Sequence, residues 1–178
     1  MSEKFSVDGV DEAVFTAEEL DAAFQQFEKT VAEVAVSGDW ERWADQFTED
    51  ADYIEHAMGT FKGRDAIKTW ICKTMRSFPG NHMVAFPSLW HVVDPSTSRV
   101  ICEIDNPMRD PGDGSVIGAT NITILTYAGD GLWSCEEDVY NPMKFGQASM
   151  DWCKKAQELG TLTDEAKAWM DTSGKFFR

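Results

Sequence analysis

The feature that most constrains the fold is a change in the spacing of apolar residues part-way along the chain. Over residues 16–47 and 63–78 the apolar side chains recur every three or four positions, which is the period of an amphipathic helix. Over residues 82–140 they alternate with polar side chains in segments separated by turn sequences, which is typical of β-strands. Helices followed by a run of strands predict an α+β domain, with the helices packed on one face of a curved antiparallel sheet.

Capping and stop signals indicate where the helices begin and end. Thr16 and Glu19 form a capping box that opens the first helix, and Gly38 ends it. Asp39 can cap a second, short helix. The remaining helices are expected over residues 63–78, 150–159 and 163–171.

Turn sequences divide the second half of the chain into strands. Asp-Pro-Ser at 94–96, a Gly- and Asp-rich stretch at 110–114 and Gly-Asp-Gly at 129–131 all favour turns, and the last suits a tight hairpin. The expected strands cover residues 52–57, 82–94, 99–106, 115–128 and 132–140.

Charge and composition exclude several classes of function. The 178 residues fit a single domain, and seven Trp with eleven Phe exclude a mainly disordered chain. A formal net charge of −15 argues against nucleic acid and against anionic membranes, both of which need clustered positive charge. Neither a membrane span nor a signal peptide is expected. A small molecule is therefore the expected partner.

The four cysteines are far apart and contain no Cys-x-x-Cys spacing. This pattern indicates free thiols in a reducing cytoplasm rather than a disulfide framework or a zinc site. Carboxylates could hold Mg²⁺ or Ca²⁺, but nothing in their spacing is diagnostic, so we expect no metal and no cofactor.

Three short stretches together suggest a family. They are GDW at 38–40 leading to FTEDA at 47–51, GRDAI at 63–67, and the final strand from Gly131 to Asn141. In this order they resemble the NTF2-like superfamily, and in particular its SnoaL-like branch of polyketide cyclases, ketosteroid isomerases, scytalone dehydratase and limonene-epoxide hydrolases. The resemblance implies a cone-shaped fold over residues 16–145, preceded by an arm (1–15) and followed by a helical extension (146–178).

Strand alternation places candidate site residues on shared faces. Tyr53 and Glu55 share one face of their strand, and Glu103 and Asp105 share one face of theirs. The resemblance implies that Glu55 lies where ketosteroid isomerases carry their proton-shuttling carboxylate. It also implies that Asp105 and Asp138 match the paired acids of limonene-epoxide hydrolases.

Several carboxyl groups in one apolar cavity would favour acid–base chemistry, because burial and mutual repulsion raise carboxyl pKa values unequally. The expected base is Glu55, and the expected protonated acid is Asp105 or Asp138. Tyr53 and Asn121 would orient a substrate oxygen. His56, at the end of its strand, is an alternative acid–base group.

Aromatic residues of the predicted helices, Phe24 among them, would shape a hydrophobic ligand site. The expected substrate-binding residues are Phe27, Trp40, Trp43 and Trp70, together with Glu103 and Asn121. The reaction predicted from these residues is proton abstraction from a hydrophobic cyclic or aromatic molecule, followed by isomerisation, cyclisation or elimination.

Purely structural roles for the same residues also stay open. Glu103, Asp105 and the acidic run at 136–138 could face solvent, Tyr53 could be plain core, and His82 and His91 are expected to be structural.

Two other functions also stay open. One is an epoxide hydrolase, in which Asp138 activates water and Asp105 protonates the ring oxygen. That enzyme's Arg is replaced here by Glu103, which counts against it. The other is a non-catalytic binding or assembly module.

An apolar outer face of the sheet should be covered by a second copy of the chain, giving a homodimer. The residues expected on that face are Cys102, Ile104, Ile122, Ile124, Trp133 and Val139.

Overall fold

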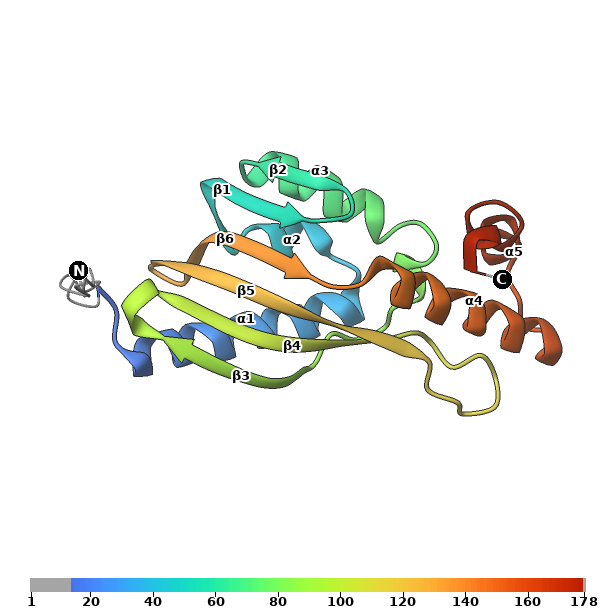
Figure 1. Ribbon diagram of the computed structural model, residues 1–178. Helices are drawn as coiled ribbons and strands as arrows, with labels where there is room; N and C mark the ends of the chain where they lie inside the picture. Colours follow the sequence, from blue (N-terminus) through green and yellow to red (C-terminus); the bar gives the residue numbers. More distant parts are fainter. Residues whose placement is uncertain (1–13, 178) are drawn as a thin grey trace, which may run out of the picture.

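A computed structural model describes residues 14–177 of the chain. Three helices precede or interrupt the first strands, four long strands follow, and further helices close the chain (Figure 1). The helices are α1 (Ala17–Ser37), α2 (Trp40–Ala44), α3 (Arg64–Thr74), α4 (Pro142–Leu159) and α5 (Asp164–Asp171), with short 3₁₀ turns at Gly80–His82, Pro95–Thr97 and Ser173–Phe177. The strands are β1 (Phe47–Glu55), β2 (Gly59–Lys62), β3 (Ser88–Asp94), β4 (Arg99–Pro107), β5 (Gly118–Gly129) and β6 (Leu132–Val139).

The six strands form one curved sheet in the order β2-β1-β6-β5-β4-β3. Every neighbouring pair is antiparallel except β1 and β6, which run parallel. The sheet is therefore mixed rather than wholly antiparallel as expected. No hairpin joins β1 to β6, so no turn constrains them to opposite directions.

Helices α1, α2 and α3 pack on the concave face of this sheet, which confirms the expected α+β architecture (Figure 1). Helix α1 begins at its predicted cap, where the Thr16 hydroxyl accepts from the Glu19 amide. It ends at Gly38, whose φ of 75° is the left-handed conformation that glycine adopts without strain. The buried face of α1 carries Leu20, Phe24, Phe27, Thr30, Val31 and Val34.

Three elements differ from the sequence prediction. Strand β3 starts at Ser88, because residues 80–82 form a 3₁₀ turn. Strand β1 is longer than expected and pairs with the short strand β2, which was not predicted. Helix α4 begins at Pro142 rather than near residue 150, since Asn141 caps it and proline is well suited to the first helical position.

The side chains of β4 that face the concave side of the sheet are the opposite set from the one expected. Cys102 and Ile104 are buried on the concave face, so Glu103 and Asp105 lie on the convex face. Trp133 also points inward, because the register between β5 and β6 shifts near Tyr127. The predicted outer face is thus wrong for Cys102, Ile104 and Trp133. The spacing of apolar residues in β4 fits the observed orientation, whereas the predicted one followed the family resemblance.

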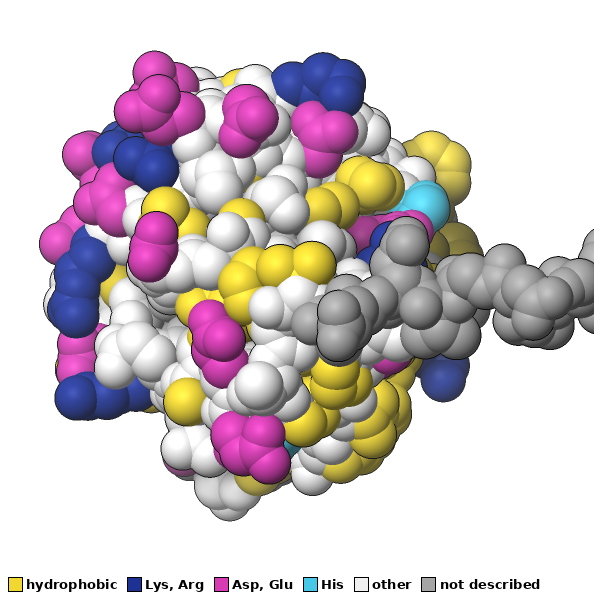
Figure 2. Space-filling model, turned by 90° about the vertical axis from the view of Figure 1, so that its left-hand side faces the viewer, with side chains coloured by type: hydrophobic (Ala, Val, Ile, Leu, Met, Phe, Trp, Pro, Cys, Tyr) yellow, Lys and Arg dark blue, Asp and Glu magenta, His cyan; other side chains and the backbone are white. Residues whose placement is uncertain are grey.

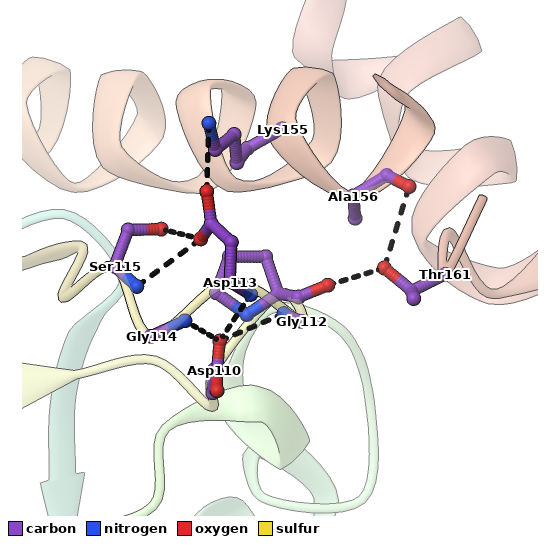
Figure 3. A network of polar contacts seen from close by, with 9 residues as sticks. Asp110, Gly112, Asp113, Gly114, Ser115, Lys155, Ala156 and Thr161 are labelled. Carbon is purple, nitrogen blue, oxygen red and sulfur yellow. Dashed lines mark hydrogen bonds and ion pairs between the residues drawn. The ribbon is translucent and has the colours of Figure 1, made fainter. Parts of the chain in front are cut away.

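The C-terminal helices lie beyond the end of β6 and have a small core of their own (Figure 1). There Trp152 of α4 packs against Phe78 and His82. Figure 3 shows how α4 also holds the loop before β5, through an ion pair of 2.8 Å between Lys155 and Asp113. Within that loop Oδ1 of Asp110 accepts from three backbone amides, which fixes its shape.

The predicted boundaries between arm, domain and extension stay predictions. The arm falls mostly outside the described residues, although Phe15 packs on Tyr127 with ring centroids 4.8 Å apart. Within residues 14–177 no helix is long and apolar enough to cross a membrane. Acidic side chains are spread over the face shown in Figure 2, in keeping with the net charge of −15.

Candidate active site

A cavity of about 160 Å³ lies between helices α1–α3 and the concave face of the sheet. Its walls are mainly aromatic and aliphatic, and its polar groups come from β1, β4, β5 and β6, with Glu28 added from α1 and Thr74 from α3. The aromatic wall consists of Phe27, Trp40, Trp43, Trp70 and Phe86. The polar groups from the sheet are Tyr53, Asn106, Asn121, Thr123, Glu136 and Asp138.

Asp138 is the most heavily hydrogen-bonded carboxyl group of the cavity. Its Oδ1 accepts from the Thr123 hydroxyl at 2.6 Å and from Nδ2 of Asn121 at 2.9 Å. Its Oδ2 accepts from the Tyr53 hydroxyl. Asn121 is held in turn, because its Oδ1 accepts from Nδ2 of Asn106 at 2.8 Å. Three donors therefore aim one carboxyl group, and Oδ2 keeps a lone pair for another partner.

Opposing effects act on the ionisation of this group. Burial raises the pKa of Asp138, while its hydrogen bonds from Thr123 and Tyr53 lower it, and the net shift is upward. Burial, followed by the negative charge of Asp138, raises the pKa of Tyr53 well above its usual value. Tyr53 is therefore a neutral donor to this carboxyl group.

Glu136 is the second carboxyl group of the cavity, two residues before Asp138 on the same face of β6. It is 5% exposed, and its Oε2 is buried without a hydrogen-bond partner. Burial, and then repulsion by Asp138, raise the pKa of Glu136 well above its usual value, against a smaller opposing effect of the Tyr53 hydroxyl. Glu136 is therefore the group that keeps a proton more readily.

Glu55 lies next to this cluster rather than on the wall of the cavity. It pairs in register with Asp138 across β1 and β6, and its Oε1 accepts from the Tyr140 hydroxyl. Its Oε2 is buried without a partner. Burial, followed by the hydrogen bond to Glu55, raises the pKa of Tyr140. The negative charge of Glu55 is thus close enough to raise the pKa of Asp138, but one of its carboxyl oxygens already accepts a hydrogen bond from Tyr140.

The other predicted acid–base residues lie away from the cavity. Asp105 and Glu103 are on the convex face, where Oε2 of Glu103 accepts from the Trp90 indole at 2.7 Å. The expectation that these two residues line the cavity is therefore wrong. His56 is exposed and pairs with Glu137 at 2.8 Å, also outside the cavity.

The predicted aromatic residues Phe27, Trp40, Trp43 and Trp70 do line the cavity, and so does Asn121. Phe24 is instead fully buried in the core and is not part of the cavity wall. The aromatic rings of the cavity contact one another as well as forming its wall. The Tyr53 ring lies 4.5 Å from that of Trp70 and 5.9 Å from that of Trp43. Trp70 also stacks on Phe61 at 4.8 Å. These contacts hold the Tyr53 hydroxyl against Asp138.

Comparison with protein families identifies the group to which these features belong. Residues 16–136 match the model of the SnoaL-like domain. The chain belongs to the SnoaL-like family. A search of curated proteins gave no match.

Two solved structures share the SnoaL-like fold at low sequence identity. One is a hypothetical protein of Catenulispora acidiphila with a ketosteroid isomerase-like fold, in complex with trimethylamine. It is 19% identical, with a TM-score of 0.53 over 73% of this chain and 91% of that one. The other, a candidate isomerase from Bacillus subtilis, is 16% identical, with a TM-score of 0.58 over 75% and 95%. These likenesses confirm the fold.

Sequence reasoning missed three polar residues that the sheet contributes to this SnoaL-like cavity, Glu136, Thr123 and Asn106, and two from the helices, Glu28 and Thr74. The signal for Glu136 and Thr123 was present, since each lies two positions from a predicted site residue on its own strand. Asn106 follows from the same alternation once Ile104 is placed inward. Among residues 14–177, no three His, Cys, Asp or Glu side chains are grouped so as to hold a metal ion.

Proposed function

We propose that this SnoaL-like protein is a cofactor-independent acid–base enzyme. Its substrate would be a hydrophobic cyclic or aromatic small molecule, and its reaction an isomerisation, cyclisation or elimination that begins with proton abstraction. One observation carries the proposal: Glu136 and Asp138 share one aromatic cavity, but only Asp138 is surrounded by hydrogen-bond donors. Pairs of carboxyl groups with separated pKa values are the usual means of acid–base catalysis without a cofactor.

Asp138 is the proposed base. Donors that hold a carboxylate favour its charged form, so Thr123, Asn121 and Tyr53 make Asp138 the easier of the two carboxyl groups to ionise. Burial keeps its pKa above that of an exposed Asp, which brings its basicity closer to that needed for a carbon-bound proton. The free lone pair on Oδ2 would receive that proton.

Glu136 is the proposed acid. Its Oε2 has no partner within the protein, so a protonated carboxyl group can donate to a polar atom of the ligand. As the proton leaves carbon, negative charge develops on that polar atom and the Glu136 proton neutralises it. In an isomerisation Asp138 would give its proton to another carbon while the polar atom returns its own proton to Glu136. In an elimination the polar atom would likewise return its proton to Glu136, and the proton on Asp138 would leave with the departing group.

Glu55 remains the alternative base. Its free Oε2 is buried and lies in the strand next to Asp138, but the Tyr140 hydroxyl holds the other oxygen. Mutation of each residue distinguishes Asp138 from Glu55 as the base. Asp138→Asn should abolish turnover if Asp138 is the base, whereas Glu55→Gln should then reduce it only through its influence on Asp138.

A mass-resolved substrate screen tests the reaction class. The wild-type protein and Asp138→Asn are incubated with cyclic enones, small aromatic ketones, aryl-propane diols and cyclic epoxides. A product of unchanged mass, or one that has lost water or formaldehyde, made by the wild type alone, supports the proposal. Gain of one water would instead indicate an epoxide hydrolase. Binding of these compounds without turnover would indicate a non-catalytic binding module.

We also propose a homodimer formed through the convex face of the sheet. Trp90, Val92 and Val139 are exposed large apolar residues of β3 and β6, and Ile122 and Ile124 are half-buried on β5. Glu103 and Glu137 lie among them in the register, and a sheet face that exposes several large apolar side chains is commonly covered by a partner. Light scattering at micromolar concentration should give twice the mass of the chain, and Trp90→Glu should reduce it to one. A monomeric wild type would contradict the proposal.

A further inference from the structure

The chemistry of the cavity wall suggests which ligands it prefers. Five aromatic rings from Phe27, Trp40, Trp43, Trp70 and Phe86 form much of the wall. Three acidic side chains also contribute to it, and no Lys, Arg or His among residues 14–177 lines it. The negative faces of aromatic rings attract cations, Trp most strongly. A wall made of aromatic rings and acids, without a basic group, favours a positively charged ligand.

Glu136 gives this wall one specific group with which a ligand can form a hydrogen bond. Its side chain is buried, lines the cavity and has one oxygen, Oε2, that no protein atom satisfies. Leaving a buried polar atom unpaired costs free energy, so such atoms usually have a partner, and a ligand can supply one. The titratable groups that interact with Glu136 are Asp138, Tyr53, Cys102 and Cys135, and all of them are acids. Glu28, which also lines the cavity, is an acid as well.

We propose that the cavity binds a small tertiary amine, with the nitrogen hydrogen-bonded to Oε2 of Glu136 and its alkyl groups against the aromatic rings. This inference goes beyond the proposed function and does not rest on it. Binding itself requires no turnover.

Proton balance follows from this assignment. A neutral amine would accept the proton of Glu136 and form an ammonium–carboxylate pair, with no net change in protons. An amine that enters already protonated would pair with ionised Glu136, so the proton held by Glu136 is released to solvent. In either case the bound pair shares one proton. The ammonium group is then stabilised by the carboxylate and by cation–π contacts in a site with little water.

Two probes of nearly equal shape test the inference by calorimetry. In 2-(dimethylamino)ethanol a nitrogen replaces one CH group of 3-methylbutan-1-ol, so the two differ mainly in charge. At about pH 7.5 the aliphatic amine is protonated. We expect the amine to bind at least about tenfold more tightly than the alcohol. Titrations in buffers of different ionisation enthalpy should show release of about one proton with the amine and none with the alcohol.

Matched carboxyl-to-amide variants locate the effect. Glu136→Gln should abolish both the preference for the amine and the proton release, while the alcohol binds as before. Glu103→Gln removes a carboxylate from the convex face and should change neither. Circular dichroism and thermal melting of both variants exclude unfolding as the cause of any loss.

Equal affinity of the wild type for the two probes would overturn the inference, and so would amine binding that survives Glu136→Gln. These results would leave the proposed function untouched, because turnover of cyclic ketones in the substrate screen does not depend on an amine. Conversely, amine binding with proton release but no turnover of any substrate would support the ligand class and contradict the enzyme.

Discussion

The hydroxyl group of Thr123 on β5 donates to Oδ1 of Asp138 on the adjacent strand β6 across 2.6 Å. The two residues are direct partners in the sheet register, so the backbone ladder itself holds the donor beside the acceptor. Both side chains face the cavity. This contact offsets part of the effect of burial on Asp138 and thus helps to set the pH at which the carboxyl group ionises.

Replacing Thr123 by Val removes this donor while keeping the side-chain shape. Because a hydrogen bond to a carboxylate favours its charged form, its loss should raise the pKa of Asp138 further. We expect the acid limb of the kcat/KM profile to move to higher pH, by about one unit. Thr126→Val, on the opposite face of the same strand, is the control and should leave the profile unchanged. An unshifted limb in Thr123→Val would mean that Asp138 is not the titrating base.

Glu136→Gln should be more stable than the wild type at high pH, and the difference in the free energy of unfolding should grow as pH rises. The pKa of Glu136 is raised in the folded state, so its contribution to stability is present below its unfolded pKa and is lost as pH rises. The amide is neutral at every pH and avoids that loss. We expect the variant to gain about 1 to 3 kcal/mol over the wild type between pH 4 and pH 8 in urea denaturation. A difference that does not depend on pH would contradict the burial of an ionisable Glu136.

His82 should make the protein sensitive to acid. Burial, and then the positive charge of Arg109, lower the pKa of His82 to about 4, against an opposing effect of Glu165. The unfolded chain therefore binds a proton near pH 6.5 that the folded chain binds only near pH 4. The free energy of unfolding should fall as pH drops through this range, by up to about 3 kcal/mol from this residue alone.

His82→Phe tests that expectation. The imidazole ring packs between Phe78 and Trp152, with centroids at 4.9 and 4.6 Å, so a phenyl ring can occupy the same place. Urea denaturation at several values between pH 4 and pH 7 should give a flatter dependence for the variant than for the wild type. Parallel curves would mean that folding does not lower the pKa of His82.

Glu165 anchors α5 to the chain segment that follows α3. Its carboxylate accepts from the Phe78 amide at 2.8 Å and from Nδ2 of Asn81 at 2.7 Å. Glu165→Ala leaves both donors without this acceptor and should cost about 1 to 3 kcal/mol in the free energy of unfolding. Glu158→Ala, at an exposed position of α4, should cost much less. Equal costs would show that the contact adds nothing to stability.

The fold could be predicted because its signals are local. The N-cap at Thr16, the stop at Gly38 and the turn at 129–131 each act within a few residues of chain, and the structure contains all three. The parallel pairing of β1 with β6 could not be predicted in the same way. It joins segments that are more than 75 residues apart and leaves no local trace.

The site was predicted less completely than the fold, for a physical reason. Alternation shows which residues share a face of a strand but not which face is inward, so Asp105 was assigned to the cavity and Asn106 was overlooked. Burial of Cys102 and Ile104 decides between the two faces of β4. Tyr53, Asn121 and Asp138 were placed in the cavity correctly, whereas their mutual hydrogen bonds appear only in three dimensions.

Deuterium incorporation tests the central claim most directly, since it reports carbon–hydrogen cleavage without requiring the natural substrate. Cyclohex-3-en-1-one in D₂O should gain deuterium and convert to the conjugated isomer with the wild-type protein. Asp138→Asn should slow this exchange at least about 100-fold, towards the uncatalysed rate, while Glu103→Gln should not change it. Exchange at the wild-type rate in Asp138→Asn, together with its loss in Glu55→Gln, would contradict the assignment of Asp138 as the base.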